Sequence, residues 1–172
     1  MDNHLITRQI EIDMGHRVTY HASKCRNIHG HRYRIHAHCR GPLAGEGSSE
    51  GMVIDFGFLK EEMMKEIHKP CDHALCLWWQ DPFIRAFFQD DTWKEIESKM
   101  KKGIFSLDPR KGDKLATQIY ITEFVPTAEN LARHWFERLR YRVVERSDKR
   151  ASLIRVDVWE TPNCRASYPG GI

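Results

Sequence analysis

The segment from Cys25 to His31 holds the residues of this chain that are best suited to chemistry. Cys25 precedes His29 by four positions, and Gly30 separates His29 from His31. Because side chains two positions apart point to the same side of an extended strand, we expect the two imidazoles to lie next to each other. Neighbouring imidazoles are natural ligands for zinc. The Cys25 thiol is then either a third ligand or a nucleophile or base beside the metal.

A third histidine joins this pair through the pattern of the preceding segment. Residues 5–16 alternate between apolar and polar side chains, which predicts a half-buried strand whose apolar face ends at His16. A single inward histidine is more often a core residue than a metal ligand. If this strand pairs antiparallel with a strand that begins at His29, the three rings of His16, His29 and His31 converge. Three histidines with a free fourth position are typical of catalytic zinc, and this favours Cys25 as a base rather than a ligand.

The same alternation separates two other histidines from this group. Residues 29–40 predict a second strand, and His36 and His38 fall on its basic face. That face also carries Arg32, Arg34 and Arg40. We expect His36 and His38 to be solvated or to lie at a subunit contact.

Acidic side chains at two further places are candidates for function. Asp72 directly precedes His73 and can orient or charge it, although a solvated loop pair is an equally good interpretation. Glu160 continues the apolar face of a predicted strand at 152–160. A carboxylate in that position needs a partner, either an arginine or a ligand with paired N–H donors.

The remaining pattern predicts an α+β domain, with an antiparallel sheet and helices on one face. Asp55 and Asp81 are predicted to cap helical segments, and Pro70 to end the first of them. Strands are predicted at 5–16, 29–40, 52–54, 118–124 and 152–160, with helices at 56–68, from Pro82 to about 101, and from Thr127 to Arg146. The tail at 163–172 is polar and predicted to lie on the surface.

Composition excludes several classes of protein. With 172 residues, one domain spanning 1–172 is the expectation. The 27 basic and 24 acidic residues are too balanced to indicate nucleic-acid binding. No apolar run approaches the roughly 20 residues of a membrane span. Five scattered cysteines form no disulfide framework. With no signal-peptide core at the N-terminus, we expect reduced thiols and a cytoplasmic location.

Several separated motifs, taken together, resemble one family. They are His16, Cys25-x3-His29-Gly30-His31, Gly51-Met52-Val53-Ile54-Asp55-Phe56, Asp72-His73, Pro126-Thr127-Ala128-Glu129-Asn130 and Glu160-Thr161. In this order, from about residue 8 to 168, they resemble the 6-pyruvoyl-tetrahydropterin synthase and 6-carboxy-tetrahydropterin synthase family. The spacing between Cys25 and the histidines is most similar to that of the bacterial 6-carboxy branch.

The resemblance implies the tunnelling fold (T-fold), in which small sheets of several subunits join into a barrel and active sites lie at the interfaces. It implies a homo-oligomer, tetramer or hexamer, and a zinc ion held by the three histidines. It implies Cys25 as the proton acceptor, with Asp72 and His73 as relay partners that reach in from a neighbouring subunit. It implies Glu160 as the anchor of the pterin ring and Thr127 as a pterin contact.

The activity that this resemblance implies is a zinc-dependent lyase of the queuosine (preQ0) pathway. Its substrate is 7,8-dihydroneopterin triphosphate and its products are 6-carboxy-5,6,7,8-tetrahydropterin, acetaldehyde and triphosphate. Lys24, Arg26 and Arg32 are near enough in sequence to meet the triphosphate. The alternatives are a 6-pyruvoyl-tetrahydropterin synthase, another reaction on a related pterin, and a zinc- or pterin-binding module without catalysis.

Two features depart from the family pattern. Residues 80–120 form a longer segment than is usual and are predicted to be an insert. Cys76-Leu77-Trp78 stands where Leu-Asn is more usual. Both affect the rim of the pocket, so they leave the chemistry in place and open the question of the substrate.

Overall fold

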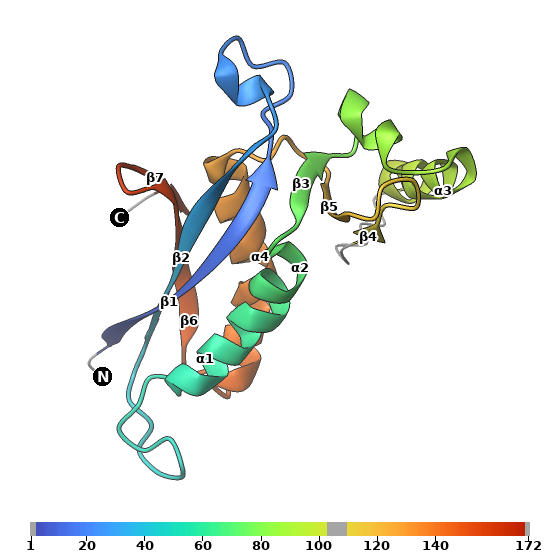
Figure 1. Ribbon diagram of the computed structural model, residues 1–172. Helices are drawn as coiled ribbons and strands as arrows, with labels where there is room; N and C mark the ends of the chain where they lie inside the picture. Colours follow the sequence, from blue (N-terminus) through green and yellow to red (C-terminus); the bar gives the residue numbers. More distant parts are fainter. Residues whose placement is uncertain (1–2, 103–109, 171–172) are drawn as a thin grey trace. The chain divides into compact units, whose positions relative to one another are not determined.

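The computed structural model describes residues 3–102 and 110–170, and their contacts group into two compact units (Figure 1). The first unit contains the chain up to Glu11, residues 33–69 and the chain from Ala128 onward. The second contains residues 12–32 and 70–127. The strands β1 and β2 run through both units. A single domain with an insert at 80–120 stays a prediction.

The elements follow the predicted order, with three additional strands (β3, β4 and β7) and without the strand predicted at 52–54. The strands are β1 (His4–His16), β2 (His29–Gly41), β3 (Leu75–Trp78), β4 (Arg110–Lys111), β5 (Gln118–Thr122), β6 (Ser152–Thr161) and β7 (Cys164–Tyr168). The α-helices are α1 (Phe56–Met63), α2 (Lys69–Cys71), α3 (Asp90–Lys101) and α4 (Ala128–Arg146). Shorter turns are η1 (Lys24–Arg26), a π-helical η2 (Met64–His68) and η3 (Pro82–Ala86).

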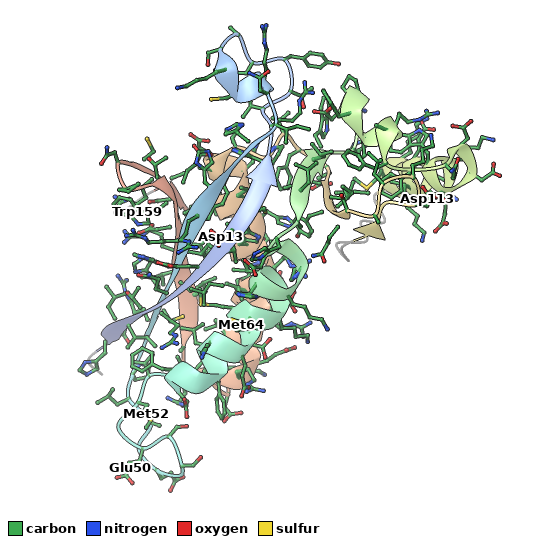
Figure 2. All side chains as sticks on the ribbon, viewed as in Figure 1. Asp13, Glu50, Met52, Met64, Asp113 and Trp159 are labelled. Atoms are coloured by element: carbon green, nitrogen blue, oxygen red, sulfur yellow. The ribbon has the colours of Figure 1, made fainter. Side chains whose placement is uncertain are left out.

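In the first unit the strand order is β1-β2-β6-β7, with antiparallel pairing of β2 with β6 and of β6 with β7. Helix α4 packs on β6 and β7, and α1 packs on α4, so both helices cover one face of these strands. The alternation predicted for β2 is confirmed, because Tyr33, Ile35, Ala37 and Cys39 are all fully buried. Figure 2 shows the side chains on the ribbon. Burial of this apolar face contributes to the hydrophobic stabilisation of the unit.

In the second unit the strand order is β4-β5-β3-β1-β2. The pairings of β1 with β3 and of β3 with β5 are parallel, so the prediction of an antiparallel sheet throughout is wrong and the sheet is mixed. The reason lies in β3, a run of four apolar residues too short and uniform to show alternation. A parallel connection needs a crossover, and helix α3 lies in the connection between β3 and β5.

Three local predictions also differ from the structure. Residues 52–54 form no strand, because the carbonyls of Met52 and Val53 accept hydrogen bonds from Arg150 and a turn closes through Ala44. The first helical region continues past Pro70 to Cys71. The polar tail contains strand β7, which was not predicted because its residues show no apolar alternation. The two predicted caps are confirmed: Asp55 accepts from the Gly57 N–H at 2.6 Å and Asp81 from the Phe83 N–H at 2.8 Å.

None of the helices in the described part of the chain is long and apolar enough to cross a membrane.

The pH dependence of stability provides a test of the packing around α4. Burial and the neighbouring Arg138 lower the pKa of His134 to about 3. The unfolded chain therefore binds a proton near pH 6.5 that the folded chain rejects, and stability is lost as pH falls below 6.5 toward the folded value. Between about pH 7.5 and about pH 5 this amounts to roughly 2 kcal/mol of unfolding free energy. We expect the unfolding free energy of His134→Gln, measured with urea, to fall between these two pH values by roughly 2 kcal/mol less than that of the wild type. An equal loss in both proteins would contradict the burial of a neutral His134.

Candidate functional site

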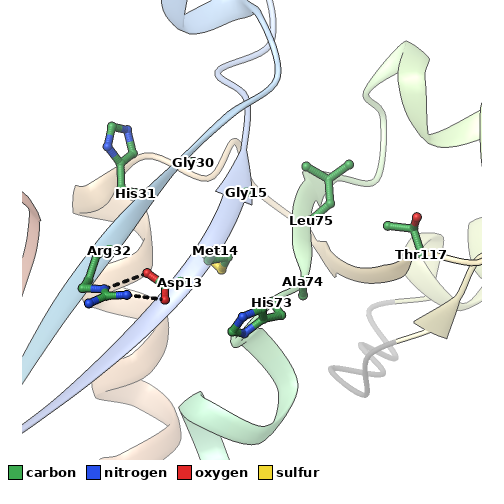
Figure 3. A pocket seen from close by; sticks show the side chains of 10 residues that line it. All are labelled: Asp13, Met14, Gly15, Gly30, His31, Arg32, His73, Ala74, Leu75 and Thr117. Atoms are coloured by element: carbon green, nitrogen blue, oxygen red, sulfur yellow. Dashed lines mark hydrogen bonds and ion pairs between the residues drawn. The ribbon is translucent and has the colours of Figure 1, made fainter.

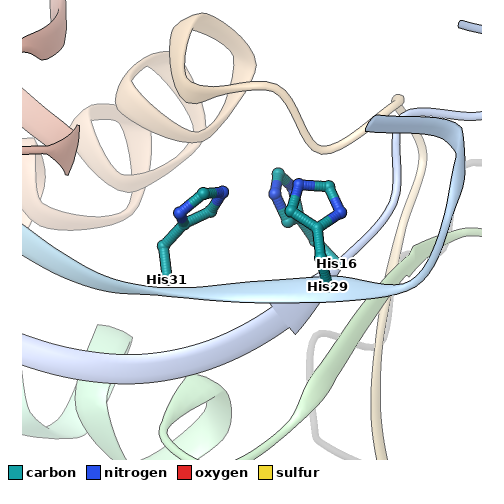
Figure 4. A group of neighbouring side chains, drawn as sticks. All are labelled: His16, His29 and His31. Atoms are coloured by element: carbon teal, nitrogen blue, oxygen red, sulfur yellow. The ribbon is translucent and has the colours of Figure 1, made fainter. Parts of the chain in front are cut away.

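The three predicted histidines come together in the second unit. His16 ends β1, and His29 and His31 begin β2 (Figure 4). One ring nitrogen from each lies within 4.8 Å of the others. The ring centroids are 4.5 to 5.2 Å apart and the rings are tilted rather than stacked. The spacing and the choice of donor fit a metal ion that sits between the rings, so this histidine group could hold one.

Backbone carbonyls orient two of these rings. His16 Nδ1 lies 2.8 Å from the Pro126 carbonyl oxygen, and His29 Nδ1 lies 2.8 Å from the Asn27 carbonyl oxygen. A carbonyl oxygen only accepts, so Nδ1 carries the proton in both rings and Nε2 keeps its lone pair. Histidines that bind metals are held by such partners in the same way.

Glycine between the two β2 histidines lets the strands approach closely. A Cβ atom at Gly30 would stand 3.1 Å from the Met14 carbonyl oxygen and 3.5 Å from the Cα of Gly15. Both contacts are to the residues of β1 that directly precede His16. A side chain at position 30 would therefore push β1 and β2 apart where the donors of the two strands must meet.

Cys25 lies in the loop that joins β1 to β2 and is partly exposed. Its carbonyl oxygen accepts a hydrogen bond of 2.9 Å from the Val18 N–H, two residues after His16. This bond ties the cysteine to the end of β1. Lys24 and Arg26 flank it in the η1 turn and are exposed, whereas Arg32 is engaged by Asp13 in a bidentate pair with both bonds at 2.9 Å.

Asp72 and His73 are joined to each other and to β1. One oxygen of the Asp72 carboxylate accepts a hydrogen bond of 2.9 Å from the Asp13 N–H. The other oxygen lies 2.9 Å from His73 Nδ1. The His73 backbone is left-handed, with φ at 58°, a conformation that costs a residue other than glycine about 1–2 kcal/mol. Its N–H donates to the Asp13 carbonyl oxygen at 2.6 Å, which holds the backbone in place.

His73 borders an open pocket of about 510 Å³ (Figure 3). Asp13, Arg32, His73 and Thr117 contribute to its lining. The Arg32 guanidinium lowers the pKa of Asp13 through its hydrogen bonds, so the carboxylate stays charged. Asp13 is an odd-numbered residue of β1 and His16 an even-numbered one, so their side chains leave opposite faces of the strand.

A buried aspartate connects the 80–120 segment to the residue after His16. Asp81 is 1% exposed, and its carboxylate lies 3.2 Å from Arg17 Nε and accepts a hydrogen bond from the Thr19 hydroxyl. The Arg17 guanidinium also stacks on the Phe83 ring at 4.5 Å. The sequence predicted Asp81 only as a helix cap. Its contacts with the loop after β1 could not be predicted, because Arg17 and Thr19 are more than 60 residues away in the chain.

The remaining predicted residues lie in both units. Thr127, in the second unit, directly follows Pro126, whose carbonyl holds His16. Glu160, in the first unit, accepts a hydrogen bond of 3.2 Å from the hydroxyl of the fully buried Tyr33. Tyr33 is therefore a partner for the inward carboxylate that sequence pattern alone did not identify.

Thiol chemistry tests the placement of Cys25. All five cysteines are free, and Cys39, Cys71 and Cys76 are buried. Burial raises the pKa of Cys39 to about 12 and raises that of Cys76 as well, so neither forms the reactive thiolate. We expect iodoacetamide to modify Cys25 and Cys164 in the native protein and all five thiols after denaturation, as measured by peptide mass spectrometry. Rapid native modification of Cys39 or Cys76 would contradict the described packing.

Comparison with known proteins supplies the family. The family model described as 6-pyruvoyl tetrahydropterin synthase matches residues 5–171. A 6-carboxy-5,6,7,8-tetrahydropterin synthase of Haemophilus influenzae is 32% identical over 163 residues, covering 95% of this chain and 96% of that protein. A protein of the same name from Rickettsia bellii is 31% identical over 159 residues, covering 92% and 94%.

Solved structures support the same fold. An uncharacterized protein from Wolinella succinogenes has a TM-score of 0.70 at 20% identity and covers 99% of this chain and 100% of its own. The 6-pyruvoyl tetrahydropterin synthase of Plasmodium vivax has a TM-score of 0.63 at 15% identity, with 97% of each chain covered. The predicted α+β T-fold class is thereby confirmed, as is the prediction of a lyase-type enzyme. The chain belongs to the 6-pyruvoyl tetrahydropterin synthase family.

Proposed function

We propose that this protein is a zinc-dependent lyase that converts 7,8-dihydroneopterin triphosphate to 6-carboxy-5,6,7,8-tetrahydropterin, with release of acetaldehyde and triphosphate. The observation that carries the proposal is the group of three histidine donors within 4.8 Å of one another, with Cys25 in the loop between His16 and His29. The relatives named 6-carboxy-5,6,7,8-tetrahydropterin synthase favour this branch over the pyruvoyl branch. The product belongs to the route to queuosine, and the cytoplasm is the proposed location.

His16, His29 and His31 are the proposed zinc ligands. Three neutral imidazoles leave one coordination position for substrate oxygen. When bound, zinc supplies a Lewis acid that acidifies the hydroxyls of the substrate side chain. The carbonyls of Pro126 and Asn27 hold two of the ligand rings with Nε2 available, which removes the need to reorient them on binding.

Cys25 is the proposed base, and Asp72 with His73 the proposed proton relay. Asp72 fixes the His73 ring through Nδ1, so Nε2 of that ring is left to exchange a proton. The pair is bonded to Asp13, on the other face of β1 from His16. This placement supports a site shared between subunits, in which His73 of one chain serves the cysteine of a neighbour. We therefore propose a homo-oligomer, a tetramer or a hexamer, whose joined sheets complete a barrel.

Glu160 is the proposed anchor for the pterin ring, and Thr127 a further contact. A pterin presents an amide N–H and an amine on one edge, and one carboxylate can accept from both. The Tyr33 hydroxyl holds one oxygen of Glu160 and fixes the orientation of the carboxylate. Because Tyr33 is fully buried, this orientation is set by the core of the first unit.

The reaction is tested by incubating the protein with 7,8-dihydroneopterin triphosphate and measuring acetaldehyde and pterin products. We expect acetaldehyde and 6-carboxy-5,6,7,8-tetrahydropterin in equal amounts. The 6-pyruvoyl product without acetaldehyde would assign the chain to the pyruvoyl branch. Cys25→Ala should lower kcat by about 10²–10⁴-fold through loss of the base. Cys164→Ala, which removes an exposed thiol, is the matched control and should keep full activity. An active Cys25→Ala protein would overturn the assigned base, and no turnover with any pterin would favour a binding module.

Metal content tests the ligand set. His31→Ala should lower the zinc bound per chain by one ion relative to wild type, measured by elemental analysis after dialysis against trace zinc. His21→Ala removes an exposed histidine of the same loop region and should leave the zinc content unchanged. X-ray absorption of the zinc protein should show nitrogen and oxygen but no sulfur in this site. A sulfur ligand would instead make Cys25 part of a closed, structural site.

A further inference from the structure

A second group of metal-type donors lies in the first unit, on residues that the proposed activity does not use. His36 and His38 share one face of β2, and Asp157 lies on the neighbouring strand β6, directly opposite His36. One donor atom from each lies within 4.8 Å of the others. The prediction that both histidines are solvated or at a subunit contact is wrong for His38, which is 8% exposed and bonded within its own chain.

Neighbouring side chains orient two of the three donors. His38 Nδ1 lies 2.9 Å from the Thr7 hydroxyl, which leaves Nε2 facing Asp157 Oδ2 at 3.0 Å. The other carboxylate oxygen, Asp157 Oδ1, lies 3.0 Å from Arg155 Nε. A hydroxyl on the far nitrogen of a histidine and a cation on the far oxygen of a carboxylate are the kinds of partner that hold metal ligands in place.

His36 supplies the third donor. Its Nε2 atom is buried and has no hydrogen-bond partner among the residues that the structure describes. The ring packs between two aromatic neighbours, with its centroid 6.2 Å from that of His38 and 6.4 Å from that of Trp159. A buried polar atom without a partner needs a physical reason, and a bound ion would provide one.

We propose that His36, His38 and Asp157 bind a second divalent metal ion, of the borderline class of zinc and cobalt, in the first unit of the fold. Two imidazoles and one carboxylate are a donor set that suits such ions. The ion would join β2 to β6 and give His36 Nε2 a partner, and it would replace the hydrogen bond between His38 Nε2 and Asp157 Oδ2. The proposal is independent of the histidine group at His16, since the two sets share no residue.

Arginine competes with this ion for the carboxylate. Arg165 Nη1 lies 3.7 Å from Asp157 Oδ2, the oxygen that faces the histidines, so binding must displace this weak contact. Arg155 pairs through the other oxygen and can stay in place. Arg165→Gln should therefore tighten binding, a result that a plain ion-pair network would not give.

The test is a titration of metal-stripped protein with Zn²⁺ by calorimetry, repeated with Co²⁺ by visible absorption. We expect two ions per chain in wild type and one in His29→Ala/His31→Ala, which keeps only the second group. His36→Ala in that background should abolish binding. His4→Ala, which removes an exposed histidine of β1 in the same unit, is the control and should bind as its parent does.

Thr7→Val provides a milder variant in case His36→Ala disturbs the sheet. Loss of the hydroxyl that orients His38 should weaken binding of the second ion by about 10–100-fold, while the metal-free protein still unfolds in a single cooperative transition. A single ion per chain in wild type, or unchanged binding in His36→Ala, would overturn the proposal. In either case the group would be an ion-pair network around Asp157. A failed pterin assay would leave this result untouched.

Discussion

The close approach of β1 and β2 at the histidine group is the constraint on which the site depends. Three imidazoles from two strands meet only if the strand backbones nearly touch, and Gly30 permits this because it places no Cβ against the Met14 carbonyl. The carbonyls of Asn27 and Pro126 then fix the rings. Backbone groups cannot be moved by side-chain rotation, so the donors are preorganised and a metal ion would bind with little loss of conformational freedom.

Alternation along β1 divides the chemistry between two faces of one strand. His16 leaves one face, and Asp13, which is bonded to the Asp72–His73 pair, leaves the other. A single chain therefore presents the proposed metal donors and the proposed proton relay in different directions. Assembly, with each subunit offering its Asp72–His73 pair to a neighbour's histidine group, is the arrangement that our proposal requires. The left-handed backbone of His73 is held by the Asp13 carbonyl, which ties the Asp72–His73 pair to β1.

The same period of two explains the surroundings of Asp157. Its position opposite His36 places a carboxylate on a strongly basic face, where Arg155 and Arg165 gather around it. A carboxylate that is only 2% exposed is stable when such partners offset the cost of removing it from water. These contacts make Asp157 the centre of this face, and they bring two histidines into range of one oxygen.

The sequence by itself determined the parts that depend on periodicity and local chemistry. The alternation of β1 and β2, the caps at Asp55 and Asp81, and the convergence of His16, His29 and His31 all follow from spacing, because strand geometry and hydrogen-bond rules act over a few residues. Tertiary structure alone decided the parallel placement of β3, the partner of Glu160 and the burial of His38. These depend on residues far apart in the chain, whose approach is set by packing, and no local pattern records it.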